Sequence, residues 1–445
     1  MGKYFGTDGI RGRANDTLDV DRAFKVGKYL AYYYKNIFKT AKIIIGKDTR
    51  ISGSMFEAAI AAGASALGAD VYLVGTCPTP AVAYLVNNFD YCCGIMISAS
   101  HNPYYDNGIK VFSHDGIKIS NDIELKVEAF LDDLVTIDLA TNENIGHVYN
   151  YEKGLELYLE HLKANFNMDL SGMKIAVDCA NGSSSVTAKR LLSDLNADLK
   201  VINDQPDGIN INTNCGSTHP ETLQALVKAE DFDLGLAFDG DADRLIAVNH
   251  DGELVDGDHV LYICANYLKS IGKLNQNTMV TTVMANLGLF KALDECEINY
   301  ESTKVGDKYV YDCMLQNDYV LGGEQSGHII FKEHATTGDG LLTALNIIAI
   351  MKKSHKTLKE LSQGLKIYPQ LLINVEVKDK ELVLQNSELL AKIASINAEL
   401  ASNGRMLVRA SGTEPLVRVM VEAETDEICE HYVYDVVDFI KKLEI

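Results

Sequence analysis

The stretch KIIIGKDTRISGSMFEAAIAAGASALGADVYLVG, residues 42–75, decides the fold class of this chain. It predicts a buried strand, then an alanine-rich helix, then a second buried strand. Strands joined in this way pair in parallel, because the crossover of a parallel pair needs about a dozen residues or more. The same order recurs from residue 173 (MKIAVDCA, TAKRLLSDLNA, LKVIN) and from residue 279 (MVTTVMA, LGLFKALDEC, INYESTKVG). The sequence therefore predicts three α/β domains built on a similar plan.

The C-terminal part follows a different pattern. Two alternating stretches, residues 371–379 and 405–424, flank a helical stretch at 381–401, and residues 427–445 predict a closing helix. This pattern favours a smaller α+β domain. The 445 residues are about three times the size of a typical domain, so several domains are expected. Boundaries are placed in polar stretches, which gives domains at 1–150, 151–253, 254–367 and 368–445.

Composition and charge exclude several classes of protein. A hydrophobic content of 47% and a charged content of 23% are typical of a folded globular chain. The net charge of -21 repels polyphosphate backbones and anionic lipids, so neither nucleic acid nor a membrane surface is expected as a partner. Nine scattered cysteines predict buried thiols rather than a disulfide framework. With no apolar signal segment or membrane span, we expect a cytoplasmic protein.

The first loop with chemical potential is GIMISASHNPYYDNGIKVF, residues 94–112. An apolar strand gives way to small polar residues around Ser100, at the end of a strand where α/β proteins bind ligands. We expect Ser100 to be exposed, with His101 beside it and the cation of Lys110 nearby. Capping of a turn is ordinarily the better explanation for a single serine, but a turn would not require Lys110.

The second loop, LGLAFDGDADRLIAV at 234–248, carries Asp239, Asp241 and Asp243 between two apolar strands. Carboxylates this close repel one another unless a cation lies among them, which predicts a hard, oxygen-preferring ion such as Mg²⁺. A calcium loop is excluded, because Arg244 and His250 occupy its glycine and glutamate positions. The alternative is a solvated acidic hairpin.

The third loop is LGGEQSGHIIF, residues 321–331. If it is extended, its alternate residues Glu324, Ser326 and His328 face one cavity. An acceptor, a hydroxyl and an imidazole in that arrangement suit the hydroxyl groups of a sugar. A glycine-rich turn with ordinary surface side chains explains the pattern about as well.

The fourth loop is VRASGTEPLVRVMVE, residues 408–422. A Ser-Gly-Thr turn can direct backbone N–H groups and hydroxyls at a phosphate, and Arg409 and Arg418 can add charge-assisted hydrogen bonds. In so acidic a chain this favours an anion site, the alternative being a hairpin with exposed arginines.

The motifs as a set closely resemble those of the α-D-phosphohexomutase superfamily, over essentially the whole chain and in the same order. The matching motifs are FGTDGIRG (5–12), SASHNP (98–103), DGDADR (239–244), GEQSGH (323–328) and RASGTEPLVR (409–418). The resemblance implies an α/β fold with three similar α/β domains with mixed sheets and a smaller C-terminal α+β domain, arranged around a central cleft.

The resemblance also implies roles for these loops. Ser100 would be the phosphoserine of the first domain, and its phosphate would help Asp239, Asp241 and Asp243 of the second domain to hold Mg²⁺. The 323–328 loop would bind the sugar, and the C-terminal loop would bind the phosphate that is not being transferred. The candidate catalytic residues are Ser100, His101, Lys110, Arg244, Arg11 and His328. The candidate substrate-binding residues are Glu324, Ser326, His328, Arg409, Ser411, Gly412, Thr413 and Arg418.

The implied reaction moves phosphate between C6 and C1 of one hexose through a 1,6-bisphosphate. Gln325, CGSTHPE (215–221) and TTGDGLLTAL (336–345) favour the branch that acts on glucosamine phosphate, which supplies amino-sugar nucleotides, over the phosphomannomutase/phosphoglucomutase branch. The expected partner is a hexosamine phosphate. His328, His101 and Lys110 all stay candidates for the general acid and base. A homodimer is compatible with the sequence, which leaves the oligomeric state open.

Two other classes stay open at this point. The stretch before Asp239 fits the start of a haloacid-dehalogenase motif with Asp239 as nucleophile, but Asp243 stands where that motif has Thr or Val. A binding protein for sugar phosphates would need neither Ser100 nor three aspartates. Acid-stable phosphate on Ser100, rather than acyl phosphate on Asp239, would distinguish these hypotheses.

Overall fold

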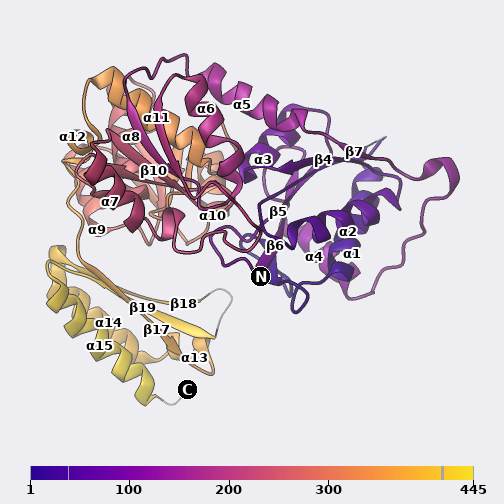
Figure 1. The fold of residues 1–445 in the computed structure, drawn as a ribbon. Coiled ribbons are helices and arrows are strands. Elements are labelled where there is room, and N and C mark those ends of the chain that lie inside the picture. The colour runs from indigo at the N-terminus through magenta and orange to yellow at the C-terminus, as the bar shows by residue number, and fades with distance from the viewer. Residues whose placement is uncertain (1, 39, 412–414, 444–445) are drawn as a thin grey trace. The chain divides into compact units, whose positions relative to one another are not determined.

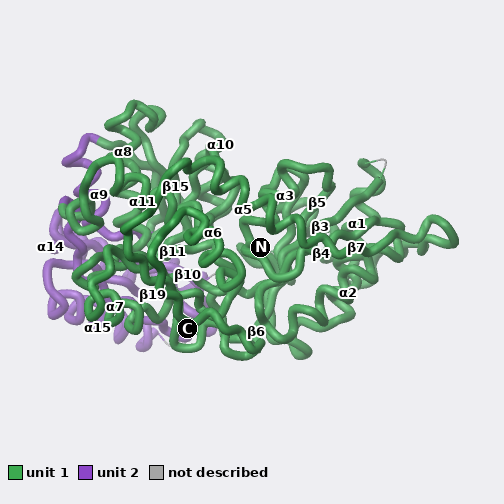
Figure 2. The backbone as a smooth tube through the Cα atoms, turned by 45° about the horizontal axis from the view of Figure 1, so that its top comes forward, with its two compact units in different colours: residues 1–283, 298–363 green, residues 284–297, 364–445 purple. Residues whose placement is uncertain are grey.

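The structure is a computed structural model in which residues 2–38, 40–411 and 415–443 are described. The helices and strands are labelled in Figure 1. The chain divides into two compact units, with residues 1–283 and 298–363 in unit 1 and residues 284–297 and 364–445 in unit 2 (Figure 2). Unit 1 holds the three sheets of the α/β plan, and unit 2 holds the fourth sheet.

The first sheet contains the strand–helix–strand predicted at residues 42–75. Its strand order is β1-β2-β6-β5-β3-β4-β7. Strands β3, β4, β5 and β7 run parallel, whereas β2 and β6 are antiparallel to their neighbours. The strands are β1 (Phe5–Gly6), β2 (Gly9–Arg13), β3 (Lys42–Lys47), β4 (Asp70–Thr76), β5 (Cys93–Ile97), β6 (Asp106–Ser113) and β7 (Val148–Asn150).

Helices cover both faces of this sheet (Figure 1). Apolar side chains of β3 and β5, including Ile43 and Ile95, pack in one cluster with buried residues of α1, α2 and α4. Helix α3 contacts β3 and β5 and packs against α5. The helices are α1 (Val20–Lys35), α2 (Gly53–Ser65), α3 (Thr79–Asn88), α4 (Asn121–Leu131) and α5 (Lys153–Asn165). The carboxyl ends of β3 and β5 therefore lead into loops that emerge from a rigid core.

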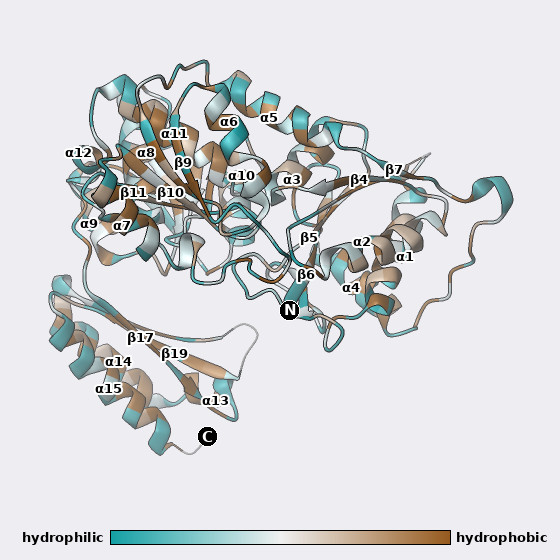
Figure 3. Cartoon of the chain, in the orientation of Figure 1, coloured by the Kyte–Doolittle hydropathy of each residue, from teal (hydrophilic) through white to brown (hydrophobic). Residues whose placement is uncertain are grey.

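The second sheet is also mixed, with the order β12-β11-β10-β8-β9. Strand β10 pairs in parallel with β8 and antiparallel with β11, and every residue of β10 and β11 is buried. Hydrophobic residues accordingly concentrate in these two strands (Figure 3). The elements are β8 (Lys174–Asp178), α6 (Ala188–Asp194), β9 (Asp198–Ile202), α7 (Glu221–Glu230), β10 (Leu234–Phe238), β11 (Leu245–Asn249) and β12 (Leu254–Val255).

The third sheet has the order β14-β13-β15-β16, with β16 antiparallel to β15. Its elements in unit 1 are α8 (Gly257–Ser270), β13 (Thr278–Thr282), β14 (Asn299–Thr303), α10 (Asp307–Asn317), β15 (Leu321–Gly323), β16 (Ile329–Phe331), α11 (Gly340–Ser354) and α12 (Leu358–Ser362). The connecting helix α9 (Leu287–Glu295) belongs to unit 2 instead. The third repeat is thus divided between the two units.

Unit 2 confirms the predicted α+β pattern, with an antiparallel sheet in the order β17-β19-β18. The predicted helix over 381–401 is wrong in one respect. It is two helices, because the side chain of Asn386 accepts a hydrogen bond from the N–H of Leu389 and begins a new one. The elements are β17 (Gln370–Glu376), α13 (Lys380–Leu384), α14 (Ser387–Leu400), β18 (Arg405–Ala410), β19 (Leu416–Glu422) and α15 (Asp426–Lys442).

Mixed sheets and the α/β class are thus confirmed, while the exact domain boundaries at 150, 253 and 367 stay predictions. Seven of the nine cysteines are buried. Within the described ranges, no helix combines the length and apolar character that a membrane span requires.

Candidate active site

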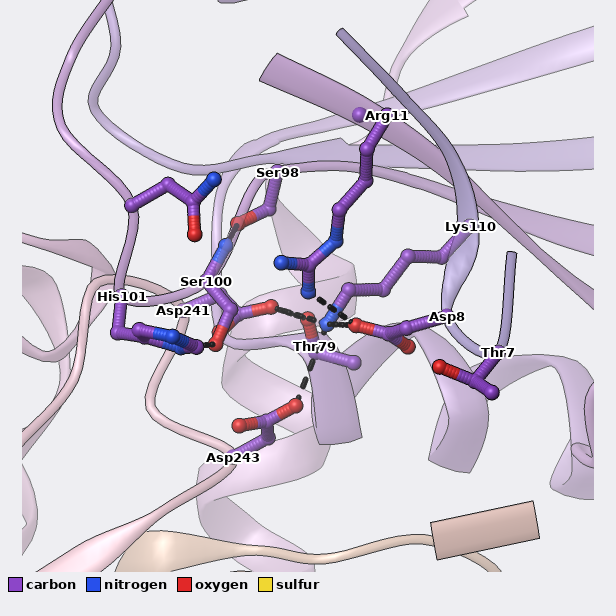
Figure 4. Close-up of polar contacts among 12 residues, drawn as sticks. Thr7, Asp8, Arg11, Thr79, Ser98, Ser100, His101, Lys110, Asp241 and Asp243 are labelled. Carbon is purple, nitrogen blue, oxygen red and sulfur yellow. Dashed lines mark hydrogen bonds and ion pairs between the residues drawn. The ribbon is translucent and has the colours of Figure 1, made fainter. Parts of the chain in front are cut away.

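Ser100 lies in the loop after β5 of the first sheet, beside His101 (Figure 4). Its hydroxyl donates a hydrogen bond of 2.6 Å to Oδ2 of Asp239, which follows β10. Its backbone has a φ of 53°, in the left-handed region that non-glycine residues rarely adopt. The prediction that Ser100 is exposed is wrong, since its relative exposure is 0%. The second sheet's loop covers it, which strand patterns could not reveal.

The three aspartates of the DGDADR loop converge as predicted. Asp239, Asp241 and Asp243 are buried, and one carboxylate oxygen from each lies within 4.8 Å of the others. Oδ1 of Asp241 and Oδ1 of Asp243 are buried with no hydrogen-bond partner among the described residues. Buried carboxylate oxygens without donors are costly unless a cation satisfies them. The donor set therefore fits a hard metal ion.

Lys110 is the main cation of this centre. Its Nζ lies 2.7 Å from Asp241, 3.2 Å from Asp243 and 3.1 Å from Asp8, and its side chain is 1% exposed (Figure 4). Burial alone would lower the pKa of Lys110, but the three carboxylates raise it well above its usual value. Lys110 is therefore a fixed positive charge, held close to Ser100 through the aspartates.

The surroundings shift the pKa values of Asp239 and Asp243 in opposite directions. Burial first, then the charges of Asp243 and Asp241, raise the pKa of Asp239 well above its usual value. Burial has the same tendency at Asp243, but Lys110 and His328 hold the pKa of Asp243 well below its ordinary range. A divalent cation among these carboxylates would favour the ionised form of all three.

The remaining candidate groups of the first two sheets also lie at this centre. Nη2 of Arg11 is 2.5 Å from Oδ2 of Asp8. The backbone N–H of Arg244 donates to Oδ1 of Asp239 at 3.2 Å. Nδ1 of His101 is 3.4 Å from the Ser100 hydroxyl. Burial, with Arg244 and Arg11 nearby, lowers the pKa of His101 to about 4, so its imidazole is neutral at pH 7.

The GEQSGH loop is a turn and not the extended segment that the alternation required. Gly327 has a φ of 90°, and its N–H donates to the Glu324 carbonyl at 3.0 Å. Two of its side chains have partners outside the loop: Oε1 of Glu324 accepts from the N–H of Gly306, and Nδ1 of His328 is 3.7 Å from Asp243. Oγ of Ser326 is buried without a hydrogen-bond partner among the described residues.

Sequence patterns did not select three charged neighbours of this centre. Lys118 Nζ lies 2.7 Å from Asp8 and 2.7 Å from Asp307, and Asp307 lies 3.5 Å from Nε2 of His328. Together with Lys110 these contacts form a ring of polar and charged side chains that joins the residues around Ser100 to the GEQSGH loop. Asp8 lies within the quoted FGTDGIRG motif, whereas Lys118 and Asp307 lack a pattern that would single them out.

The two arginines of the fourth loop lie in unit 2. Arg409 on β18 is the direct cross-strand partner of Arg418 on β19. Burial, and then the charge of Arg418, lowers the pKa of Arg409. The N–H of Ser411 donates to the carbonyl of Leu416 at 2.8 Å. The other two predicted members of this loop, Gly412 and Thr413, lie outside the described residues.

Comparison with known proteins identifies the family. Models of the four phosphoglucomutase/phosphomannomutase domains match this chain in order: α/β/α domain I at residues 2–136, domain II at 156–252, domain III at 256–368 and the C-terminal domain at 372–439. The chain belongs to this family, and the predicted membership of the α-D-phosphohexomutase superfamily is confirmed. The family match favours this interpretation over a haloacid-dehalogenase fold.

Individual relatives narrow the comparison. Phosphoglucosamine mutase of Lachnospira eligens is 52% identical over 99% of both chains. The enzyme of the same name from Geobacillus thermodenitrificans is 51% identical over 99% of both.

Solved structures agree on the fold. A phosphoglucomutase/phosphomannomutase family protein of Burkholderia thailandensis superposes with a TM-score of 0.81 at 25% identity, covering 98% of this chain and 97% of that chain. Aspergillus fumigatus N-acetylphosphoglucosamine mutase, solved with GlcNAc-6P and magnesium, gives 0.72 at 20% identity, covering 99% and 96%. At that identity the second similarity shows the fold alone.

Proposed function

We propose that this chain is a phosphoglucosamine mutase, an isomerase that interconverts glucosamine 6-phosphate and glucosamine 1-phosphate. The relatives of that name, about half identical over the full length, support this activity. The observation that carries the proposal is the hydrogen bond from Ser100 to Asp239 within a cluster of three carboxylates. A nucleophilic hydroxyl beside a site for a hard cation suits phosphoryl transfer.

Mg²⁺ is the proposed cofactor, held by Asp239, Asp241 and Asp243 together with a phosphate oxygen on Ser100. The Oδ1 atoms of Asp241 and Asp243, which lack hydrogen-bond partners among the described residues, support this assignment. When bound, the ion would neutralise charge that builds up on the phosphoryl group during transfer. Lys110 would act alongside it, because a charged ammonium can stabilise the equatorial phosphoryl oxygens.

In the proposed reaction, phosphorylated Ser100 gives its phosphoryl group to the C1 hydroxyl of glucosamine 6-phosphate. The P–O bond to Ser100 breaks and the serine oxygen takes up a proton, while a P–O bond to the C1 oxygen forms and the C1 hydroxyl loses its proton to a base. The resulting 1,6-bisphosphate turns over, and its 6-phosphate returns to Ser100. His101, neutral near pH 7, suits a proton acceptor, whereas the permanently charged Lys110 suits charge stabilisation.

The remaining loops would bind the substrate. Glu324 and Ser326 would contact the sugar, with His328 fixed beside them by the N–H of Gly338, which donates to its Nε2 at 2.9 Å. The C-terminal loop would hold the phosphate that is not being transferred, through Arg409, Ser411, Gly412, Thr413 and Arg418. The cross-strand pairing of Arg409 and Arg418 supports an anion site, since an anion relieves the repulsion between two guanidinium groups. We place the enzyme in the cytoplasm, where buried thiols persist.

The test compares glucosamine, glucose and mannose phosphates as substrates of the purified enzyme. We expect glucosamine phosphate to be turned over at least about tenfold more efficiently than glucose phosphate. Intact-mass measurement should find acid-stable phosphate on Ser100. Equal efficiency on glucosamine and glucose, or a preference for mannose, would assign the chain to the phosphomannomutase/phosphoglucomutase branch instead.

A further inference from the structure

The backbone around Ser100 is held by a set of contacts that the proposed mechanism does not use. The carbonyl of Ser100 accepts hydrogen bonds from Nη2 of Arg50 at 3.1 Å and from Nδ2 of Asn212 at 2.9 Å. The same two nitrogen atoms also donate to the carbonyl of Asn102, at 2.5 Å and 3.1 Å. Two donor nitrogens with two hydrogens each thus bind two carbonyls on either side of His101.

The two donor side chains lie in loops that connect elements of different sheets. Arg50 lies in the loop between β3 and α2, and it is fully buried in an ion pair with Asp48. Asn212 lies in the loop between β9 and α7 of the second sheet, and it is 8% exposed. The same two loops contact each other beside the donors, since the N–H of Ile51 donates to the Gly208 carbonyl at 2.9 Å. The donors are therefore fixed before any substrate binds.

The DGDADR loop packs closely against the same Ser100 carbonyl. A Cβ atom on Gly240, between Asp239 and Asp241, would lie 2.5 Å from the Ser100 carbonyl oxygen. Only glycine permits this approach, so the aspartates and the Ser100 backbone are packed as one body. The left-handed φ of Ser100 is a strained conformation for a non-glycine residue and persists only where the surroundings enforce it.

We infer that Arg50 and Asn212 are positioning residues that form a backbone clamp on residues 100–102. The clamp holds Ser100 in the left-handed conformation that directs its hydroxyl at Asp239. It acts on the reaction only through Ser100, so the inference rests on the proposed phosphoserine function. Loss of one donor should leave substrate binding unchanged and slow the transfer step, because misplacing a reacting atom costs rate rather than affinity.

The test variant is Asn212→Gly, with Asn214→Gly as its matched control. Asn212 has a φ of 57° and Asn214, exposed two residues later in the same loop, has a φ of 52°, so glycine suits both backbones. We expect Asn212→Gly to lower kcat at least about tenfold with KM changed less than about twofold. The control should keep wild-type values. Equal kcat for the two variants would overturn the clamp.

Arg50→Lys is the second variant, because it keeps a cation beside Asp48. The buried carboxylate of Asp48 therefore keeps a charged partner. A single ammonium cannot reproduce the planar donor geometry of the guanidinium, so kcat should again fall while KM is kept. The double variant Arg50→Lys/Asn212→Gly should lose less than the product of the two single effects, since both donors hold the same carbonyls. Fully multiplicative losses would mean that the residues act separately.

Hydrogen exchange separates this inference from the proposed function. Amide exchange in a peptide covering residues 97–107 is measured in the wild type and the four variants without substrate. We expect faster exchange in Asn212→Gly than in Asn214→Gly, at equal melting temperatures. Unchanged exchange would overturn the clamp even in an active mutase. Faster exchange in a protein whose wild type fails to isomerise glucosamine phosphate would support the clamp and contradict the proposed function.

Discussion

The charged side chains around Ser100 in unit 1 and the pair Arg409 and Arg418 in unit 2 are arranged in opposite ways. At the Ser100 centre, Lys110 contacts three carboxylates, so opposite charges are matched inside the protein. On the β18–β19 hairpin, Arg409 and Arg418 are paired side by side. The contrast also exists within that hairpin, since Arg405 pairs with Glu422 in the same register.

The difference indicates that the two sites have different roles. Matched charges that are fixed before the substrate arrives favour a chemical step, because they need little rearrangement during the reaction. Two like charges on adjacent strands favour capture of an anion, because a bound anion relieves the repulsion between them. Changes at the Ser100 centre should therefore reduce turnover, and changes at the arginine pair should weaken substrate handling.

The largest effect is expected from Ser100→Ala. The change removes the proposed phosphoryl carrier, so multiple turnover should fall at least about 10³-fold. Activity and intact mass are measured together, and the phosphate on the protein should be absent. Ser120→Ala, at an exposed serine, is the control. Near wild-type turnover in Ser100→Ala would rule out the phosphoserine mechanism.

Asp241→Asn should have the next largest effect, about 10²-fold on activity. One anionic ligand becomes neutral, and Lys110 loses its contact of 2.7 Å with that charge. Titration of activity with Mg²⁺ should show a weaker apparent affinity, while exposed Asp251→Asn should behave as wild type. If neither this variant nor a chelator alters activity, the acidic loop is structural.

On the other side of the comparison, Arg418→Ala should reduce kcat/KM about ten- to hundredfold, since a charged hydrogen bond to phosphate is worth about 1.5 to 3 kcal/mol. The loss should be similar for the hexose 1-phosphate and the 6-phosphate, because either end is held there. Arg190→Ala, which breaks a half-exposed pair with Glu156, is the control. A loss confined to one isomer would contradict a shared phosphate site.

Local sequence patterns predicted most of the fold and the central residues of the candidate site. The strand–helix–strand at 42–75 is visible because apolar periodicity is a local property. The DGDADR loop is visible because three carboxylates in five residues need an explanation within the loop itself. These features depend on neighbours in sequence, which is why the structure reproduces them.

The features that the sequence did not predict depend on residues far away along the chain. Ser100 is buried because Asp239, far along the chain, covers it. Lys118 and Asp307 are paired across 189 residues. The GEQSGH loop turns because Gly327 adopts a positive φ, whereas alternation alone suggested an extended segment. Tertiary contacts decide such properties, and one sequence does not contain them in a local form.

The smallest predicted effect concerns Glu324, a carboxylate of the GEQSGH loop. Its Oε1 accepts a hydrogen bond of 3.1 Å from the N–H of Gly306, which orients it without neutralising its charge. A cationic 2-amino group could gain a charge-assisted bond there that a 2-hydroxyl cannot match.

Glu324→Gln keeps the shape and removes the charge, so glucosamine phosphate should lose about tenfold in kcat/KM and glucose phosphate about threefold or less. The two losses are compared in one preparation, with exposed Glu333→Gln as the control. Equal losses would mean that Glu324 binds hydroxyls common to both sugars. In that case the preference for the amino sugar must arise from another contact, and Ser326 becomes the next residue to change.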